Sequence, residues 1–315
     1  MSDADNYISD PPQEQHSLEA RMLRARERLK AIERNCWYLG IVGLNDIPTP
    51  YVFVSGIVLQ NVEEAPTSTE LHQAMEKWQN AFFVGHYSGN VRHEIAIDRA
   101  VYPHDSEALW MARYAHYALC VRTLRTMSAP VLSDHSWSTI AAFKDRTVVA
   151  EVPESHGRRW VYQPQRDVTL ADLEWVTRFY DHFVHLWFSG KGKFRTAVEA
   201  FIDHPWQTSS RVATAMLWAG IEALIGEPEN ITQGLVQDIP VYLELDGERR
   251  AALRKQVKSG YRTRSKAAHG NNPSDPMEFI EQADFARQLF SRLLCKTIED
   301  GKVPSREDLD TLATT

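Results

Sequence analysis

The spacing of hydrophobic and polar positions predicts helices along most of the chain. Hydrophobic residues recur every three or four positions over residues 17–39, 69–84 and 106–127, which is the period of an amphipathic helix. A further helix is predicted over 169–188, where Thr169 can cap the first turn and the hydrophobic period continues to Phe188. The region before residue 190 is therefore predicted to be mostly helical.

Two stretches depart from the helical period and predict a small β element. Residues 51–59 (YVFVSGIVL) form a short hydrophobic run rich in β-branched and aromatic side chains, which favours a strand. Residues 146–152 and 158–163 flank the turn sequence PESHG, which predicts a hairpin with a loop of about five residues. We expect this element to interrupt an otherwise helical region.

A helical bundle is predicted after the glycines of Gly190-Lys191-Gly192. Amphipathic helices are predicted over 193–204, 210–225 and 248–269, and a fourth begins at the capping sequence DPME, residues 275–278. Four helices with one longer connection favour a bundle. The fold class is thus mainly α, in four predicted parts: a flexible tail (1–16), a larger N-terminal sensing or regulatory region (17–190), a helical bundle (193–300) and a C-terminal tail (301–315).

Composition narrows the class of protein. The chain has 315 residues and a net charge of −7, so a surface that coats nucleic acid as a whole is not expected, and any RNA contact must be local. Cys36, Cys120 and Cys295 are far apart, which indicates neither a disulfide framework nor a thiolate zinc site. The polar N-terminus and the lack of a hydrophobic run near ~20 residues predict a cytoplasmic protein without membrane segments.

One segment concentrates positive charge. Eight basic residues and no acidic residue occur from Arg249 to Lys266. A solvated helix face explains most runs of this kind. Because this run leads into an arginine and a histidine, we expect it to contact RNA, through Arg254, Lys258 and Lys266.

The run ends in YRTRSKAAHG, residues 261–270, where an arginine extends a hydrophobic stripe. On an ideal helix Arg264 shares a face with Leu253, Val257 and Tyr261. A charge at such a position must either pair with a buried anion or open onto a cleft or interface, because an unpaired buried charge is costly. Glu222, on the inward side of the helix over 210–225, is the predicted partner.

The histidine of this segment supplies a group that titrates near neutral pH. His269 lies about 140° around an ideal helix from Arg264 and about 7.5 Å further along, so the two do not share one face. The helix could end near Gly270, or two copies of the chain could complete the site across a two-fold axis. Arg262 faces the same side as His269 and is an alternative to Arg264. Ser265, one turn before His269, could orient the imidazole or a phosphate.

YRTRSKAAHG, preceded by RVATAMLWAGIEALIG, resembles the Apea-like branch of the HEPN superfamily over residues 193–298. The family pattern is an arginine, four to six residues, and a histidine usually followed by glycine, with an upstream helix that has a glutamate before a leucine. Arg264, His269, Gly270, Glu222 and Leu224 match it. The residue after the arginine is often Asn, Asp or His in active members, whereas this chain has Ser265.

The resemblance implies a HEPN-type helical bundle that forms a homodimer and pairs its Arg/His motifs in a basic cleft. Active members are endoribonucleases that need no metal and no cofactor. The implied catalytic residues are Arg264 and His269, supported by Ser265, Glu222, Tyr261 and Arg262. The role implied for the whole chain is a toxin or antiphage defence effector, with an inhibitory or trigger partner at the N-terminal region.

Other assignments have less support in the sequence. The first alternative is a catalytically inactive HEPN module that dimerises and binds RNA or protein. His182 and His185 are one turn apart, as metal ligands can be, but no third ligand has fitting spacing, so no metal site is predicted. His93-Glu94 lacks the second histidine of a zinc-protease helix, and no glycine-rich phosphate loop occurs.

Overall fold

The chain forms two compact units in the computed structural model. The structure describes residues 11–31, 35–153, 165–189, 192–207, 209–226, 231–244, 246–268 and 277–314. The first unit comprises residues 1–42, 55–112 and 129–155, and the second comprises 43–54, 113–128 and 156–315. The predicted boundary at 190–193 lies inside the second unit, and the chain passes between the units several times.

The first unit combines an antiparallel sheet with several helices. Its strands lie in the order β3-β4-β1-β5-β6, and β4 pairs antiparallel with both β1 and β3. Leu39 and Leu59 both lie opposite Ile95, and all three side chains are buried, so one row of the core crosses three strands. The bounds are β1 (Cys36–Val42), β3 (Ile57–Asn61), β4 (His93–Asp98), β5 (Ser128–Ser133) and β6 (Ala150–Glu151).

Short helices complete the core of this unit. Leu71 of α2 (Ser68–Ala74) and Val84 of α3 (Trp78–Ser88) join Tyr38, Val131 and Trp137 in one buried cluster. The helix α1 (Pro11–Ala31) contacts the short 3-10 helix η1 (Ile140–Ala142), and its Arg21 donates to Glu70 at 2.8 Å. Glu70 also closes a capping box with Thr67, so one carboxylate both starts α2 and binds α1.

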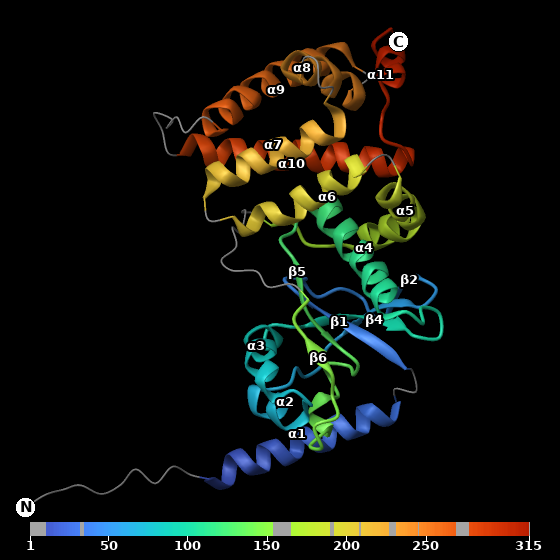
Figure 1. Cartoon of the computed structure of the whole chain (residues 1–315), viewed down its shortest axis with the longest axis vertical. Helices are drawn as coiled ribbons and strands as arrows, with labels where there is room; N and C mark the ends of the chain where they lie inside the picture. Colours follow the sequence, from blue (N-terminus) through green and yellow to red (C-terminus); the bar gives the residue numbers. More distant parts are fainter. Residues whose placement is uncertain are drawn as a thin grey trace, which may run out of the picture. The chain divides into compact units, whose positions relative to one another are not determined.

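The second unit is a group of packed helices. The helix α7 contacts α6, α9 and α10, and Figure 1 shows α7 and α10 side by side. Phe183 of α5 meets Phe194 of α6 edge-on at 5.3 Å between ring centres, and Phe201 meets Phe290 of α10 at 5.5 Å. The bounds are α5 (Leu170–Phe188), α6 (Lys193–Asp203), η3 (His204–Trp206), α7 (Ser210–Ile225), α8 (Ile231–Leu243), α9 (Gly247–Ala268), α10 (Met277–Asp300) and α11 (Arg306–Thr314).

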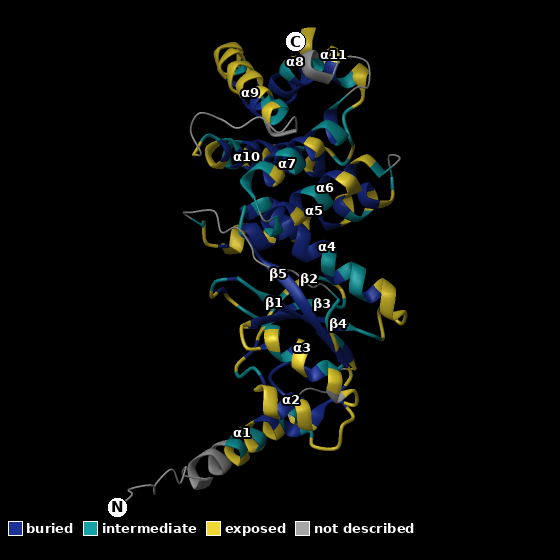
Figure 2. Ribbon diagram, turned by 60° about the vertical axis from the view of Figure 1, so that its left-hand side comes forward, coloured by how far each residue is buried: buried dark blue, intermediate teal, exposed yellow. Residues whose placement is uncertain are grey.

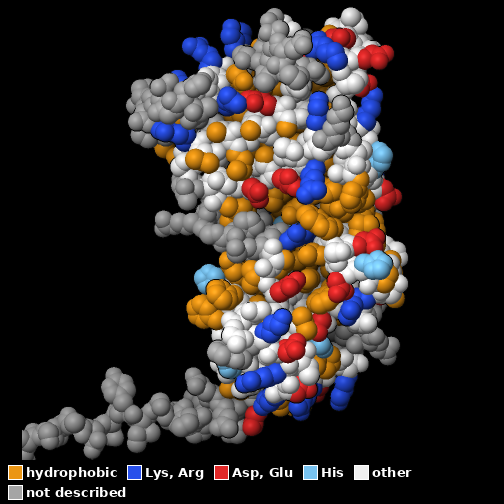
Figure 3. Space-filling model, viewed as in Figure 1, with side chains coloured by type: hydrophobic (Ala, Val, Ile, Leu, Met, Phe, Trp, Pro, Cys, Tyr) orange, Lys and Arg blue, Asp and Glu red, His pale blue; other side chains and the backbone are white. Residues whose placement is uncertain are grey.

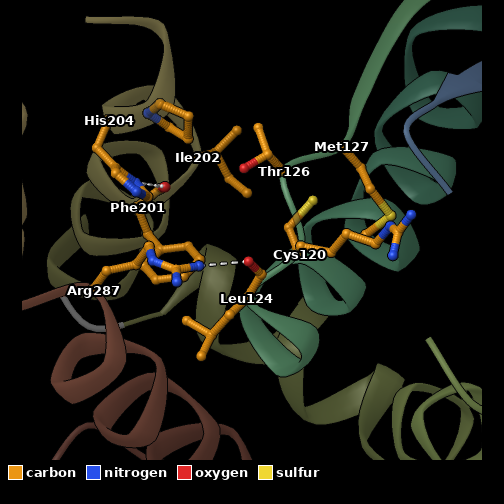
Figure 4. A pocket seen from close by; sticks show the side chains of 10 residues that line it. Cys120, Leu124, Thr126, Met127, Phe201, Ile202, His204 and Arg287 are labelled. Carbon is orange, nitrogen blue, oxygen red and sulfur yellow. Dashed lines mark hydrogen bonds between the residues drawn. The ribbon is translucent and has the colours of Figure 1, made fainter. Parts of the chain in front are cut away.

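The second unit also holds the end of α4 (Asp105–Thr123) and the strand β2 (Tyr51–Val54), which contacts α5. Arg287 of α10 donates to the Leu124 carbonyl at 2.6 Å, and Ser291 donates to the Val121 carbonyl at 2.6 Å. These bonds satisfy carbonyls that a helix end leaves without partners. Figure 4 shows Arg287 and Leu124 beside a cavity of about 20 Å³, which is room for one water molecule.

Several predicted elements of the N-terminal region differ from the structure. The helix predicted over 17–39 begins earlier, at Pro11 inside the predicted tail, and β1 begins at Cys36, because hydrophobic residues in CWYLGIV are too continuous for one helix face. The run 51–59 is two strands separated by a turn at Gly56, which has a φ of +81°. The segment 69–84 forms two helices, and residues 154–164 of the predicted hairpin lie outside the described residues.

In the second unit the predicted bounds of α5, α6, α7 and α9 agree with the structure within one residue of each described end. The prediction missed α8, which contains Pro240, and α11, which occupies the predicted C-terminal tail. Arg306 of α11 pairs with the buried Asp238 of α8 at 3.0 Å, so this last helix is attached to the unit. None of the described helices is long and hydrophobic enough to cross a membrane.

Candidate functional site

The helix α9 brings most of the predicted site residues onto one element. Leu253 and Val257 are buried, and Tyr261 and Arg264 continue the same stripe at half-buried positions, as the helical period predicts. Gly260 lets α9 approach α7 closely, since a Cβ there would lie 2.6 Å from the ring of the buried Trp218. The stripe therefore anchors α9 while its opposite face remains exposed (Figure 2).

Arg264 pairs with the carboxylate predicted for it. Its Nη2 donates to Glu222 Oε2 at 3.0 Å, with side-chain exposures of 27% for the arginine and 16% for the glutamate. The guanidinium carbon lies 5.5 Å from the centre of the Tyr261 ring, and Tyr261 meets Trp218 edge-on at 5.7 Å. A layer of Glu222, Arg264, Tyr261 and Trp218 thus joins α7 to α9.

This pair leaves hydrogen-bonding capacity unused among the described residues. Nε of Arg264 is buried and has no hydrogen-bond partner there, whereas Oε1 of Glu222 lies 3.0 Å from Arg264 Nη2 as an ion pair. A guanidinium carries five N–H donors in a planar fork that matches two oxygens of a phosphate. Arg264 is therefore held in place by one carboxylate, while 27% of its side chain remains exposed.

The predicted RNA contacts differ in their availability. Arg254 and Lys258 are exposed on α9, and no ion pair joins either one to a described residue. Lys266 is exposed too, but its Nζ donates to Glu278 Oε1 of α10 at 2.9 Å. The same oxygen accepts from the buried Thr263 at 3.2 Å, so Lys266 takes part in the contact between α9 and α10.

The exposed cations follow one ridge of the helix. Arg254, Lys258, Arg262 and Lys266 are spaced four residues apart, which is about 6 Å of rise per step. Arg262, the alternative to Arg264, is exposed on this ridge rather than on the buried stripe. Figure 3 shows Lys and Arg side chains gathered over α9. The structure thus distinguishes Arg264, which is half-buried and paired with Glu222, from a row of exposed cations on the same helix.

Other basic residues of the run have structural partners. Arg250 is half-buried and donates to the carbonyls of Glu244 at 2.6 Å and Leu312 at 3.3 Å, which links α9 to α11. Ser265 is half-buried on α9, one position beyond Arg264. His269 and Gly270 lie outside the described residues, so the predicted pairing of Arg264 with His269 remains a prediction.

Residues that the sequence did not single out also shape this site. Glu278 accepts hydrogen bonds from Thr263 and Lys266. Only its place in the capping sequence of a predicted helix was evident from the sequence. Thr263 lies three positions after Gly260, which faces the buried Trp218, and this helical step was the available signal for a buried hydroxyl. His182, considered as a metal ligand, lies with Nδ1 2.9 Å from the Ile298 carbonyl. In the described ranges no three His, Cys, Asp or Glu side chains gather as a metal site would require.

Two other buried titratable groups lie outside this site. Burial lowers the pKa of His204, on the cavity of Figure 4, to about 3, so its imidazole is neutral at pH 7. Burial raises the pKa of Glu94, in the first unit, to about 7, against hydrogen bonds from Ser136, Gln60 and the Trp137 amide.

Comparison with known proteins adds no family or relative to this description. The chain matches no protein-family model, no curated protein and no solved structure. Any assignment of function therefore depends on the geometry of α7, α9 and α10 and on the sequence resemblance of residues 193–298.

Proposed function

We propose that the second unit is a HEPN-type bundle and acts as a metal-independent endoribonuclease. The observation that carries the proposal is Arg264: its side chain is 27% exposed, is held by Glu222 and Tyr261, and lies on the helix that carries the exposed cations. A fixed guanidinium of this kind can neutralise charge that develops on a phosphate. The exposed ridge would hold the flanking phosphates of an RNA strand.

The proposed chemistry is attack by a ribose 2′-hydroxyl on its own 3′-phosphate. A P–O2′ bond forms and the P–O5′ bond breaks, which leaves a 2′,3′-cyclic phosphate and a 5′-hydroxyl. His269 accepts the proton of the 2′-hydroxyl or supplies one to the leaving 5′-oxygen, while Arg264 binds the phosphate oxygens. DNA lacks the attacking hydroxyl and should not be cut.

In this proposal the protein is a homodimer. Arg264 and His269 do not share one face of a regular helix, so a two-fold arrangement of two α9 helices would let the arginine of each copy act with the histidine of the other. We further propose that the chain serves in antiphage defence or as a toxin, and that the first unit restrains or triggers the nuclease. Both roles rest on the resemblance of residues 193–298 to the HEPN superfamily.

The test is cleavage of RNA by purified protein in excess EDTA. His269→Ala and Arg264→Ala should each lower the rate by about 100-fold or more, since general acid/base help typically contributes about 10² to 10⁴. Arg262→Ala tests the alternative arginine. Arg249→Ala is the matched control. It removes an exposed cation near the start of α9, about 22 Å from Arg264 along the helix, and should keep full activity.

Cleavage that persists in both the His269 and the Arg264 variants would reject the proposed site. Products that carry a 3′-hydroxyl would reject the proposed chemistry, since attack by the 2′-hydroxyl leaves a cyclic phosphate. The Arg254→Ala and Lys258→Ala variants should bind RNA more weakly. Each should also reduce the slope of log affinity against log salt concentration by about one, because each removes one phosphate contact.

The second candidate is a HEPN module that dimerises and binds RNA or protein without cutting. It is favoured by the ion pairs of Arg264 with Glu222 and of Lys266 with Glu278, which tie α9 to its neighbours as structural contacts would. Ser265 in place of the Asn, Asp or His of active members also favours it. RNA bound by the exposed ridge but cut by no form of the protein would support this candidate.

A further inference from the structure

A groove in the first unit lies between α2 and α3 and has a volume of about 340 Å³, within the range of small-molecule sites. Its wall on α3 consists of Gln79, Phe82 and His86, which lie at i, i+3 and i+7 on one helix face. Ser68 and His72, one turn apart on α2, form the opposite wall. The groove is therefore lined by side chains of both helices at helical spacing.

Small residues make the hollow. Ala81 and Gly85, one turn apart, line the groove beside the longer side chains. At Gly85 the two helices come close together, since a Cβ there would lie 3.0 Å from Ser68 Oγ. A larger residue at this position would fill the groove, so its shape depends on the glycine.

Phe82 is the most unusual residue of the groove. It is 79% exposed, and its neighbour Phe83 is 63% exposed, so two large hydrophobic rings lie together on the surface, as they do at binding sites. The two rings meet edge-on, with 5.8 Å between centres and 81° between planes. Figure 3 shows hydrophobic side chains gathered over α3 with a histidine beside them. A largely exposed aromatic ring thus lines a concave site.

The polar groups of the groove suit a flat heteroaromatic ligand. Gln79 presents a donor and an acceptor side by side, as the edge of a nucleobase requires, and the imidazoles of His72 and His86 and the Ser68 hydroxyl add further hydrogen-bonding groups. An aromatic side chain stacks on any base through its π-face. Among the described residues no Lys or Arg lines the groove, so its recognition would be of the base and not of a phosphate.

We propose that this groove binds a nucleobase, stacked on Phe82 and hydrogen-bonded by Gln79. The base could belong to a free nucleotide or to a single-stranded RNA, because both present the same ring. The site is in the first unit and its occupation does not depend on the nuclease proposed above.

The experiment is saturation-transfer NMR on the full chain with AMP, GMP, CMP and UMP, and with a 2′-O-methylated RNA oligonucleotide that cannot be cut through its 2′-oxygen. Base protons of at least one probe should receive saturation, whereas ribose 5-phosphate should show none. Titration of wild type and of Phe82→Ala then distinguishes the sources, because RNA can also bind the ridge of α9. In the binding that Phe82→Ala removes, an oligonucleotide about tenfold tighter than its mononucleotide identifies RNA, and equal affinities identify a free nucleotide.

Phe82→Ala should weaken binding about tenfold or more, and Gln79→Ala should change the preference among the four bases. Phe188→Ala is the matched control, since that ring is 77% exposed and lies in the other unit. His269→Ala should bind as wild type does, which keeps failure of the nuclease distinct from failure of the groove. The groove variants and the Phe188 control alter exposed side chains, and circular dichroism would verify the folding of every variant.

The proposal is overturned if no base-containing probe receives saturation, or if Phe82→Ala binds them as tightly as wild type. Self-association that Phe82→Ala abolishes, with no signal from any nucleotide, would also overturn it and would show that Phe82 and Phe83 contact a second copy of the chain.

Discussion

A single buried carboxyl in the first unit illustrates how one residue can set the response of the protein to pH. Burial raises the pKa of Glu94 to about 7, although Ser136, Gln60 and the Trp137 amide donate hydrogen bonds to it at 2.6, 2.6 and 2.8 Å. In the unfolded chain the same carboxyl titrates near 4.5. Between these values the folded protein binds more protons than the unfolded chain, so its stability falls as the pH rises.

We predict that Glu94→Gln removes this loss, which amounts to about 3 kcal/mol between pH 4.5 and 7 at roughly 1.4 kcal/mol per pKa unit. The glutamine oxygen can accept from the Trp137 amide, and its NH₂ can donate to Ser136 and to a turned Gln60. Urea unfolding at pH 5 and pH 8 measures the effect. The exposed Glu107→Gln should keep the wild-type difference, and an equal difference in the Glu94 variant would contradict the assignment.

At the scale of elements, the packing of α9 on α7 depends on a close approach at Gly260. An added methyl group would lie 2.6 Å from the Trp218 ring, which is fully buried and cannot move away cheaply. Overpacking of this kind typically costs about 1 to 3 kcal/mol, whereas replacing glycine by alanine inside a helix contributes up to about 1 kcal/mol. The cost of overpacking is therefore larger than the gain in helix propensity.

We predict that Gly260→Ala lowers the free energy of unfolding by about 1 to 2 kcal/mol. Gly234→Ala in α8 is the control, because its Cβ would meet only Asp238 Oδ2, at 3.5 Å, and the helix propensity of alanine should then stabilise the protein. Denaturant unfolding of both variants measures whether each substitution lowers or raises the free energy of unfolding. A Gly260→Ala variant as stable as wild type would mean that α9 is free to shift away from α7.

The elements that could be predicted are those marked by residues close together in the sequence. The helix α5 was predicted from the cap Thr169 and from a hydrophobic stripe that continues to Trp187, and the structure adds a capping box between Thr169 and Asp172. The pair of Arg264 with Glu222 followed from one charged residue on a hydrophobic stripe. The strand β1 did not follow, because its partner β4 is more than fifty residues away and a short buried run fits either a helix or a strand. The helix α8 was missed for a different reason: it contains Pro240, and proline inside a helix is normally a stop signal.

At the scale of the whole molecule, long-range contacts decide where the compact units end. Glycines at 190 and 192 indicate a boundary in the sequence, yet the second unit also contains residues 43–54, 113–128 and the helix α5. Phe194, just after those glycines, is buried against Phe183 of α5. Arg287 and Ser291 of α10 bind the carbonyls at the end of α4. Contacts of this kind have no local signal in the sequence.

A fragment that starts at Lys193 should therefore not fold as a stable unit, although it contains the whole predicted bundle. It would expose Phe194 and leave the buried Arg287 without the Leu124 carbonyl, and a buried group that loses its partner costs about 1 to 3 kcal/mol, more when it is charged. We predict a broad thermal transition by circular dichroism and dye binding typical of exposed hydrophobic surface, beside a cooperative transition for the full chain. A fragment with a sharp transition at the full-length Tm would show that α6 to α11 suffice, and that the contacts with α4 and α5 contribute little to the stability of the bundle.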